Sequence, residues 1–466
     1  MKKTIITVCL LAMMFALAAC RGGDGGAPAT PATPAPPAPA TPAPATPAPQ
    51  AEVDTEDELE EIEIRVAWWG DTVRNDLYME ILETFTDAFP HISVIPEPIS
   101  WGDYIDRLTV QVAGGNAPDF ISMNPQFSSE FILRGVLEPL DRFVADGTLD
   151  FTGWQEGVIN TGRHEGRLYL VPMGVAVFAN YLNVGMFNEL GVRLPDRIWY
   201  WDDVRAIGLE AREALDAAGM NNAFFFGDWT ADISLFRFYV RSYGYELWTP
   251  EGGLGIGPEV LQSFWNMFAE LRELRIVPDA ATGAEFAGAT LETNMFSRQR
   301  VMVAETSANQ FPMWNRTFPD KEIALQRFPQ MQGAPVTDFP SGSTFAVAST
   351  SPEPRQRAAV QLINHWVNSP ESLYLFRLDQ GIPGNEAQHH VFVPYLNIYQ
   401  QQLMEFSNWV LSEARPTVFP ARGSIEVTSL FSYYGERVAF GMMSIEEASE
   451  LFVQEATEAL ARHQQD

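Results

Sequence analysis

The alternation of hydrophobic and polar side chains predicts a strand at residues 62–70, which ends in two tryptophans and a glycine. Apolar side chains then recur at helical spacing up to Pro90, and they are Leu77, Ile81, Leu82, Phe85 and Phe89. Further strands are predicted at 92–96 and 118–123, with a helix at 104–112 between them. Because strands and helices alternate, this segment predicts a parallel sheet with helices on its faces.

The pattern changes after residue 172, where helix-rich segments with aromatic inserts replace the regular alternation. We therefore predict a boundary between two lobes at this point. Apolar periodicity in the remaining chain predicts helices at 201–217, 260–274, 355–368 and 445–460, and a strand at 301–304.

The first residues have the pattern of a secretory signal, because Lys2 and Lys3 precede an uncharged apolar stretch at 4–19. That stretch is short for a membrane span. Its end, Leu17-Ala18-Ala19-Cys20, resembles the lipobox of bacterial lipoproteins, in which cleavage leaves the cysteine as the lipidated first residue. The resemblance implies a signal peptide at 1–19 and fatty acylation, such as palmitate, on Cys20. The alternative is an ordinary signal with an Ala-x-Ala site.

A tether is predicted at residues 20–61. Its first part, 28–50, is almost wholly Pro, Ala and Thr, a composition that favours an extended polyproline II conformation. At about 3.1 Å per residue, such a stalk reaches up to roughly 70 Å. The acidic run at 52–63 extends it by charge repulsion. About 400 residues follow, enough for two domains of ordinary size.

Composition limits the partners of this chain. A formal net charge of −30 disfavours nucleic acid and anionic lipid headgroups, and it makes a polyanionic ligand less probable unless a local basic pocket overrides it. Of the two cysteines, Cys9 lies in the predicted signal and Cys20 at the lipidation site. No disulfide is therefore expected in the mature chain, and 46% hydrophobic residues favour stabilisation by a packed core.

Motifs for enzyme chemistry are missing. The sequence has no G-x-S-x-G elbow and no S-x-x-K motif, and its six histidines are scattered. We expect no catalytic residue, no metal site and no cofactor. A surface-anchored glycoside hydrolase stays open as an alternative, because its two carboxylates need not be close in sequence. An adhesive lipoprotein is a third possibility.

A series of short blocks identifies a family resemblance. They are 66–70, Trp101-x-x-Tyr104, 114–119, 135–141, 166–169 with Pro172, 181–183 with Phe187, 201–204, 296–302, 369–371 and 381–383. In this order and spacing they resemble the extracellular solute-binding proteins of carbohydrate uptake, the maltose-binding-protein-like receptors of ATP-driven importers. In one block the family often has Gly-x-Ala-Met, whereas this chain has Arg300-Val301-Met302.

The resemblance implies an α/β fold of the two-lobed, periplasmic-binding-protein type II, in which each lobe is a sheet flanked by helices. It implies one lobe at 62–173 plus 342–383 and the other at 174–341 plus 384–466, with the ligand in the cleft between them. The implied function is capture of a sugar or oligosaccharide and delivery to membrane permease subunits of an ABC importer. The protein would act without covalent chemistry, as a monomer anchored by lipid at the extracytoplasmic face of the cell membrane.

Candidate ligand-binding residues follow from the rule that the crevice of a parallel sheet lies beyond the carboxyl ends of its strands. After the first and third strands these are Trp68, Trp69, Gly70, Asp71, Met123, Asn124 and Gln126. From the second lobe and the crossings we add Trp101, Asp228, Trp229, Ser307, Asn309, Trp314, Gly342 and Tyr433. A sugar needs a flat aromatic for its C–H face and polar groups for its hydroxyls. Most tryptophans in a protein of this kind pack in the core, and adjacent strand residues face opposite ways, so we expect one of Trp68 and Trp69 to be buried and the other to lie near the cleft.

Overall fold

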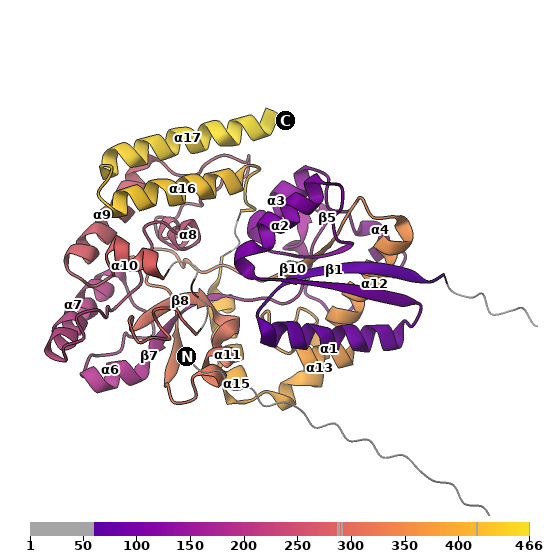
Figure 1. Cartoon of the computed structure of the whole chain (residues 1–466), viewed down its shortest axis with the longest axis horizontal. Coiled ribbons are helices and arrows are strands. Elements are labelled where there is room, and N and C mark those ends of the chain that lie inside the picture. Colours follow the sequence, from indigo (N-terminus) through magenta and orange to yellow (C-terminus); the bar gives the residue numbers. More distant parts are fainter. Residues whose placement is uncertain (1–59, 287–288, 290–291, 416–417, 466) are drawn as a thin grey trace, which may run out of the picture. The chain divides into compact units, whose positions relative to one another are not determined.

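The computed structural model describes residues 60–286, 289, 292–415 and 418–465 (Figure 1). The chain divides into two units between Glu58 and Leu59, and every described residue belongs to the second. The predicted signal, Cys20 and nearly all of the predicted tether lie outside the described residues. Among the helices that the structure describes, none combines the length and apolar character that crossing a membrane requires.

Five strands form the first sheet in the order β2-β1-β3-β10-β6. They are β1 (Ile62–Trp69), β2 (Ile92–Ile99), β3 (Phe120–Met123), β6 (Val171–Pro172) and β10 (Thr344–Val347). β1 pairs in parallel with β2 and with β3, which confirms the predicted parallel arrangement. β10 returns from far along the chain and pairs antiparallel with β3 and β6, a long-range pairing that local periodicity does not encode.

Helices cover both faces of this sheet. On one face are α1 (Thr72–Ala88), α12 (Glu353–Asn368) and α13 (Pro370–Phe376), and on the other are α2 (Trp101–Ala113) and α3 (Pro125–Leu133) (Figure 1). The alternation in β1 explains this division, because Ile64, Val66 and Trp68 pack toward α1 and α12. Ala67 and Trp69 pack toward α2 and α3. Small elements complete this part: α4 (Asp141–Ala145), α5 (Glu156–Asn160), β4 (Arg163–His164) and β5 (Arg167–Leu168).

The second sheet is antiparallel and has the order β8-β7-β9. Its strands are β7 (Phe178–Asn183), β8 (Val303–Ser307) and β9 (Ile323–Gln326). The strand predicted at 301–304 corresponds to β8, which begins two residues later and ends three residues later than predicted. Val301 is not part of it, because it forms a separate bridge with Phe224. The helices around it are α6 (Val184–Leu190), α7 (Trp201–Ala217), α8 (Ile233–Ser242), α9 (Pro258–Glu273), α10 (Ala280–Glu285), η1 (Ala308–Gln310) and α11 (Phe311–Thr317).

The C-terminal part is helical, and it completes a second hydrophobic core, which lies among α7, α8, α9, α16 and α17. Its elements are η2 (Glu386–Gln388), α14 (His389–Phe392), η3 (Val393–Tyr395), α15 (Ile398–Glu413), α16 (Ser424–Ala439) and α17 (Ile445–Gln465). α16 and α17 pack with α8 and α9 in a core rich in aromatic rings, for example Phe236 against Phe431 with centroids 5.0 Å apart. The four later helices predicted from apolar periodicity are all present, as α7, α9, α12 and α17.

Three backbone segments meet where the chain passes between the two sheets. Val175 bridges Ile382, and Ala176 bridges Ser341. Glycine allows this approach, because a Cβ on Gly342 would lie 2.2 Å from the Gly174 carbonyl oxygen, and the φ of Gly342 is +145°. These segments lie close to the lobe limits predicted at 173/174 and 341/342, although the full division into lobes stays a prediction.

Candidate ligand-binding cleft

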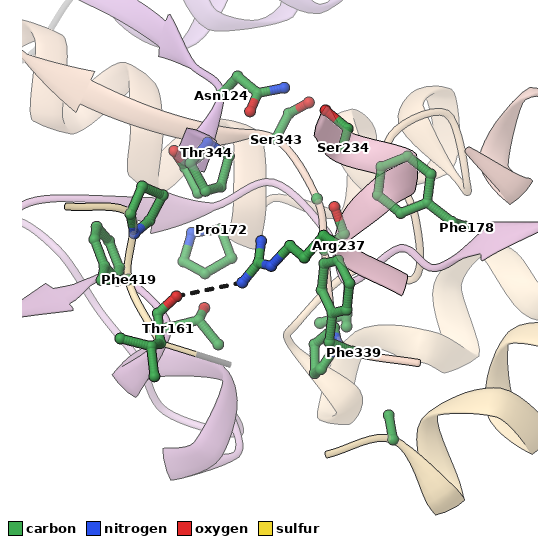
Figure 2. A pocket seen from close by; sticks show the side chains of 18 of the residues that line it. Asn124, Thr161, Pro172, Phe178, Ser234, Arg237, Phe339, Ser343, Thr344 and Phe419 are labelled. Carbon is green, nitrogen blue, oxygen red and sulfur yellow. Dashed lines mark hydrogen bonds between the residues drawn. The ribbon is translucent and has the colours of Figure 1, made fainter. Parts of the chain in front are cut away.

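A cavity of about 530 Å³ opens beside these crossing segments. Its volume falls in the usual range for small-molecule sites. The two sheets both contribute to its lining, through Asn124 after β3, Thr344 at the start of β10 and Phe178 at the start of β7. Helices α5, α8 and α16 contribute further residues, as does the segment 418–420 (Figure 2). A ligand in this cavity therefore touches parts of the chain that belong to both sheets.

Aromatic side chains form much of the apolar wall. Phe178 and Phe339 lie with their ring centroids 6.2 Å apart, and Phe339 stacks on Phe238 behind it at 4.9 Å. Trp248 and Phe419 also line the cavity. Figure 2 shows Phe178 and Phe339 on one side of the cavity and Phe419 on the other. Such rings offer flat apolar surfaces to a ligand.

Polar groups are distributed among these rings. Asn124, Ser234 and Ser343 line the same side of the cavity in Figure 2. The Ser343 hydroxyl lies 2.8 Å from the Gln380 amide oxygen, and the Thr344 hydroxyl donates to the Met123 carbonyl at 2.9 Å. The Thr344 bond fixes the start of β10 against the end of β3, and the Ser343 contact joins the residue before β10 to Gln380, so these polar groups sit on a rigid frame.

One cation reaches into the cavity from α8. The Arg237 guanidinium carbon lies 4.3 Å from the centroid of the Phe339 ring, and Nη2 donates to the Val418 carbonyl at 3.3 Å (Figure 2). Burial lowers the pKa of Arg237 to about 10, against the opposing effect of the Glu246 carboxylate. The side chain is therefore charged at neutral pH.

Two of the predicted site residues line this cavity, namely Asn124 and Gly342. Asn124 follows β3 directly, as the rule for parallel strands requires. Gln126 lies in α3, but its side chain is outside the described part of the structure. Ligand contact by Asn124 and Gly342 stays a prediction.

The two tryptophans at the end of β1 are not among the residues that line the cavity. Trp68 is buried and donates from Nε1 to the Asn75 side-chain oxygen at 2.9 Å. Trp69 is buried on the opposite face, edge-on to Trp101 and Tyr104. The strand period thus placed the two tryptophans on opposite faces correctly. Neither side chain is among the residues that line the described cavity, and the expectation that one of them lies near the cleft stays a prediction.

Gly70 and Asp71 form the beginning of α1. A Cβ on Gly70 would lie 2.9 Å from the Arg74 side chain, and the Asp71 carboxylate accepts a hydrogen bond from the Arg74 backbone N–H at 2.9 Å. Asp71 is therefore the N-cap of this helix. Met123 is fully buried beneath α2 and α3, and Trp101 is half exposed at the start of α2. None of these four lines the described cavity.

Asp228 and Trp229 have structural partners in the second core. The Asp228 carboxylate forms an ion pair with Arg272 at 2.8 Å and accepts from the Thr230 hydroxyl. Trp229 is 1% exposed and packs among aromatic rings that include Trp201, at 5.2 Å. Neither lines the described cavity.

The remaining candidates also lie outside the described cavity lining. Ser307 ends β8 rather than following it, and its hydroxyl donates to Asn309, whose amide donates to the Asp379 carbonyl. Trp314 is buried against Tyr181 with centroids 5.6 Å apart. Tyr433 is exposed on α16, with the Arg437 guanidinium 3.3 Å from its ring centroid. Ligand contact by these residues stays a prediction.

Sequence reasoning missed Arg237, Phe178, Phe339 and Phe419. A signal existed for Arg237, because it is a charge within the otherwise apolar and aromatic run 235–240 of a helix. Phe339 lies three residues before Gly342, which the sequence did single out. Phe178 and Phe419 carry no local signal, because only the long-range packing brings them to the cavity.

Outside the cavity lining, the buried carboxyl group of Glu305 also has a shifted pKa. Burial raises the pKa of Glu305, in β8, to about 8, and the backbone N–H of Gly227 opposes this shift in part. Among the described residues, no group of three or more His, Cys, Asp or Glu side chains is arranged to hold a metal ion.

Comparison with solved structures shows which known proteins share this fold. A periplasmic solute-binding protein of Pectobacterium atrosepticum has 20% identity and a TM-score of 0.75, with 86% of this chain and 99% of that chain covered. A periplasmic oligogalacturonide-binding protein of Yersinia enterocolitica, in complex with saturated digalacturonic acid, has the same identity and TM-score over 86% of this chain and 100% of that chain. An ABC substrate-binding protein of Listeria monocytogenes, in complex with cycloalternan, has 18% identity and a TM-score of 0.73 over 86% and 100%. These likenesses confirm the predicted two-lobed fold.

Sequence comparison gives the family. Proteins of Brucella abortus and Brucella suis that are named putative binding proteins are 24% identical over 181 residues, which cover 38% of this chain and 42% of theirs. The match thus spans less than half of the length of these curated relatives. Residues 70–372 match the family of bacterial extracellular solute-binding proteins. With most of its length matched, the chain belongs to this family.

Proposed function

We propose that this protein is the substrate-binding lipoprotein of an ABC importer, which captures a sugar or oligosaccharide in the described cavity and delivers it to a membrane permease. The observation that carries the proposal is the cavity itself. It combines aromatic walls with hydroxyl and amide groups, and both sheets contribute to its lining.

Sugar chemistry matches this lining. A pyranose has an apolar C–H face that packs on a ring and hydroxyls that need donors and acceptors. Phe339 and Phe419 supply rings, while Asn124, Ser234 and Ser343 supply polar atoms. The oligosaccharide ligands of the Listeria and Yersinia proteins support the same class of ligand here.

The position of the cavity supports capture by closure. Its lining comes from both sheets, and the backbone between them passes through a few tightly packed residues around Gly342. A ligand that contacts both lobes stabilises the closed form relative to the open form, so binding shifts the population toward closure. The permease would then recognise the closed form.

Anchoring would keep this receptor close to the permease. A lipid on Cys20 and the Pro-rich stalk that follows raise the local concentration of the body while leaving it free to turn. A monomer is the simplest form for docking on a permease.

A panel of neutral and acidic oligosaccharides, titrated by calorimetry and thermal shift, tests the proposal. Phe419→Ala should weaken binding about 10-fold or more, because it removes a wall of the cavity. Tyr433→Ala is the matched control, since it removes an aromatic ring from the surface outside the cavity lining and should leave affinity unchanged.

Three results would count against the proposal. Binding of peptides or polyamines with no response to any saccharide would contradict sugar capture. Release of cleaved products from the same panel would favour the hydrolase. Equal affinities for the Phe419→Ala and wild-type proteins would exclude this cavity as the site.

The anchor requires a separate experiment in cells. Cys20→Ala should move the protein from the membrane fraction to the soluble fraction without changing its Tm. Retention in the membrane fraction after this substitution would contradict lipid anchoring.

A further inference from the structure

The cavity has an unusual distribution of charge for this chain. Among the described residues that line it, Arg237 is the only one with an ionisable side chain, and no carboxylate is present. The chain as a whole carries a formal net charge of −30. A cation at the binding cavity therefore runs against the composition, which by itself disfavours anionic ligands.

The neighbouring arginine on the same helix serves a different purpose. Arg241 is completely buried, donates to the Thr337 carbonyl at 2.7 Å and pairs with the Glu246 carboxylate. It holds the segment behind Phe339 and does not line the cavity. Arg237, one turn earlier, lines the cavity with its guanidinium directed across it (Figure 2).

The surroundings of Arg237 fix its orientation. The Phe339 ring lies beneath the guanidinium and the Val418 carbonyl accepts from Nη2, so the group is held before any ligand arrives. A planar guanidinium matches the two oxygens of a carboxylate and forms charge-assisted hydrogen bonds with them. The Glu246 carboxylate offsets part of the free-energy cost of burying this cation, and a ligand anion in the cavity would add to that compensation.

From this geometry we infer that the saccharide carries a carboxylate that binds Arg237, so that the protein selects uronic acids over neutral sugars. This inference rests on the proposed function and specifies its ligand class. A phosphate ester carries a charge between about −1.5 and −2 at pH 7, which one arginine balances less well than a monoanion. A sulfate ester is the other monoanion, and the experiment separates it from a carboxylate.

The test uses the full-length protein, and it compares sugars in matched neutral and acidic pairs. Cellobiose is compared with cellobiouronate, and galactobiose with galacturonosyl-galactose and with monosulfated galactobiose, so that each acidic sugar carries a single charge; mixed oligosaccharides from neutral and uronic polysaccharides extend the panel. Thermal shift identifies binders and calorimetry gives Kd. We expect a uronic saccharide to bind at least about 10-fold more tightly than its neutral counterpart.

Substitutions then assign the selectivity to this side chain. Arg237→Gln should weaken uronate binding about 30-fold and neutral-sugar binding less than about 3-fold, while Arg237→Lys, which keeps the charge and loses the fork, should lie between. Arg205→Gln is the matched control, because it removes the same charge from an exposed ion pair with Glu270 on the surface. Circular dichroism and the Tm of each variant show whether it has folded.

The outcomes distinguish failure of this inference from failure of the proposed function. If only neutral sugars bind, the inference fails and the proposed function stands. If no saccharide binds, both fail. Tighter binding of the sulfated sugar than of the uronate, or equal losses in Arg237→Gln and Arg205→Gln, would overturn the role given to the carboxylate and to Arg237.

Discussion

Gly342→Ala tests whether the close approach of the backbone segments at Gly342 and Gly174 is needed for the stability of the folded protein. The added Cβ would lie 2.2 Å from the Gly174 carbonyl oxygen, far inside van der Waals contact, and the backbone at φ +145° is a conformation that L residues rarely adopt. Strain of this kind costs about 1 to 3 kcal/mol, and relief of the clash requires the crossing segments to separate. We expect a loss of about 3 kcal/mol in the free energy of unfolding.

The magnitude can be converted to a melting temperature. With an unfolding entropy of about 2.1 cal/mol/K per residue, a body of about 400 residues has roughly 0.8 kcal/mol/K, so about 3 kcal/mol lowers Tm by about 4 °C. Because Gly342 lines the cavity, the shift of the crossing should also weaken ligand binding. Differential scanning calorimetry and urea unfolding measure the first effect, and ligand titration the second.

Gly333→Ala provides the matched control. Gly333 also has a positive φ, +75°, but a Cβ there meets no atom within 4 Å. Its replacement should cost about 1 to 2 kcal/mol from the backbone conformation alone and should leave ligand affinity unchanged. Equal losses of stability in the two variants, with unchanged affinity in both, would refute the reasoning from the close approach.

Three further predictions concern single side chains. Glu305 has a folded-state pKa of about 8 against an ordinary value of 4.5, so its contribution to stability is complete below about pH 4.5 and is lost as pH rises through 8. Between pH 5 and pH 9 the Tm should therefore fall less in Glu305→Gln than in the wild type. Parallel curves of Tm against pH would show that Glu305 does not cause the pH dependence. Arg327→Met removes the buried partner of Asp338, whose carboxylate accepts from Nε at 2.9 Å, and should cost about 3 to 5 kcal/mol in urea unfolding; a loss below about 1 kcal/mol would contradict an uncompensated buried charge. Asp71→Ala removes a helix cap and should cost about 1 kcal/mol without changing ligand affinity, whereas a loss of affinity would restore Asp71 to the binding site.

The sequence predicted the elements whose pattern is local. The alternation at 62–69 and the spacing from Leu77 to Phe85 are properties of neighbouring residues, so β1 and α1 were located within a few positions. The insertion of β10 beside β3 joins residues more than two hundred positions apart in the chain. No periodicity within either strand records that pairing, and the antiparallel half of the sheet was therefore not predicted.

The same distinction explains the candidate tryptophans. Trp68 and Trp69 were placed on opposite faces because the strand period is two. What covers each face depends on α12 (Glu353–Asn368), which is distant from β1 along the chain, and on α2 and α3. An aromatic residue at the end of a strand is thus a candidate for both the core and the cleft, and only the long-range packing decides between them.

Sheet order explains which strand ends reach the cavity. The rule for parallel sheets treats the carboxyl ends of β1 and β3 alike, but the order β2-β1-β3-β10-β6 puts β3 beside β10, whose start adjoins the crossing at Gly342. β1 is one strand further from this crossing. Asn124 after β3 therefore lines the cavity, whereas Asp71 after β1 begins α1 instead.

The distance of a strand from the crossings is therefore a better guide to which residues line the cavity than the direction of the strand alone. The cavity lining gathers at the segments that pass between the sheets, around Pro172, Phe339 and Thr344, and at the facing helix that carries Arg237. In the proposed mechanism, movement of the two lobes would change the shape of this cavity, since the same few residues form both its wall and the connection between the sheets. Under the proposed function, ligand affinity and lobe closure would depend on one set of contacts, which is why we expect Gly342→Ala to alter both.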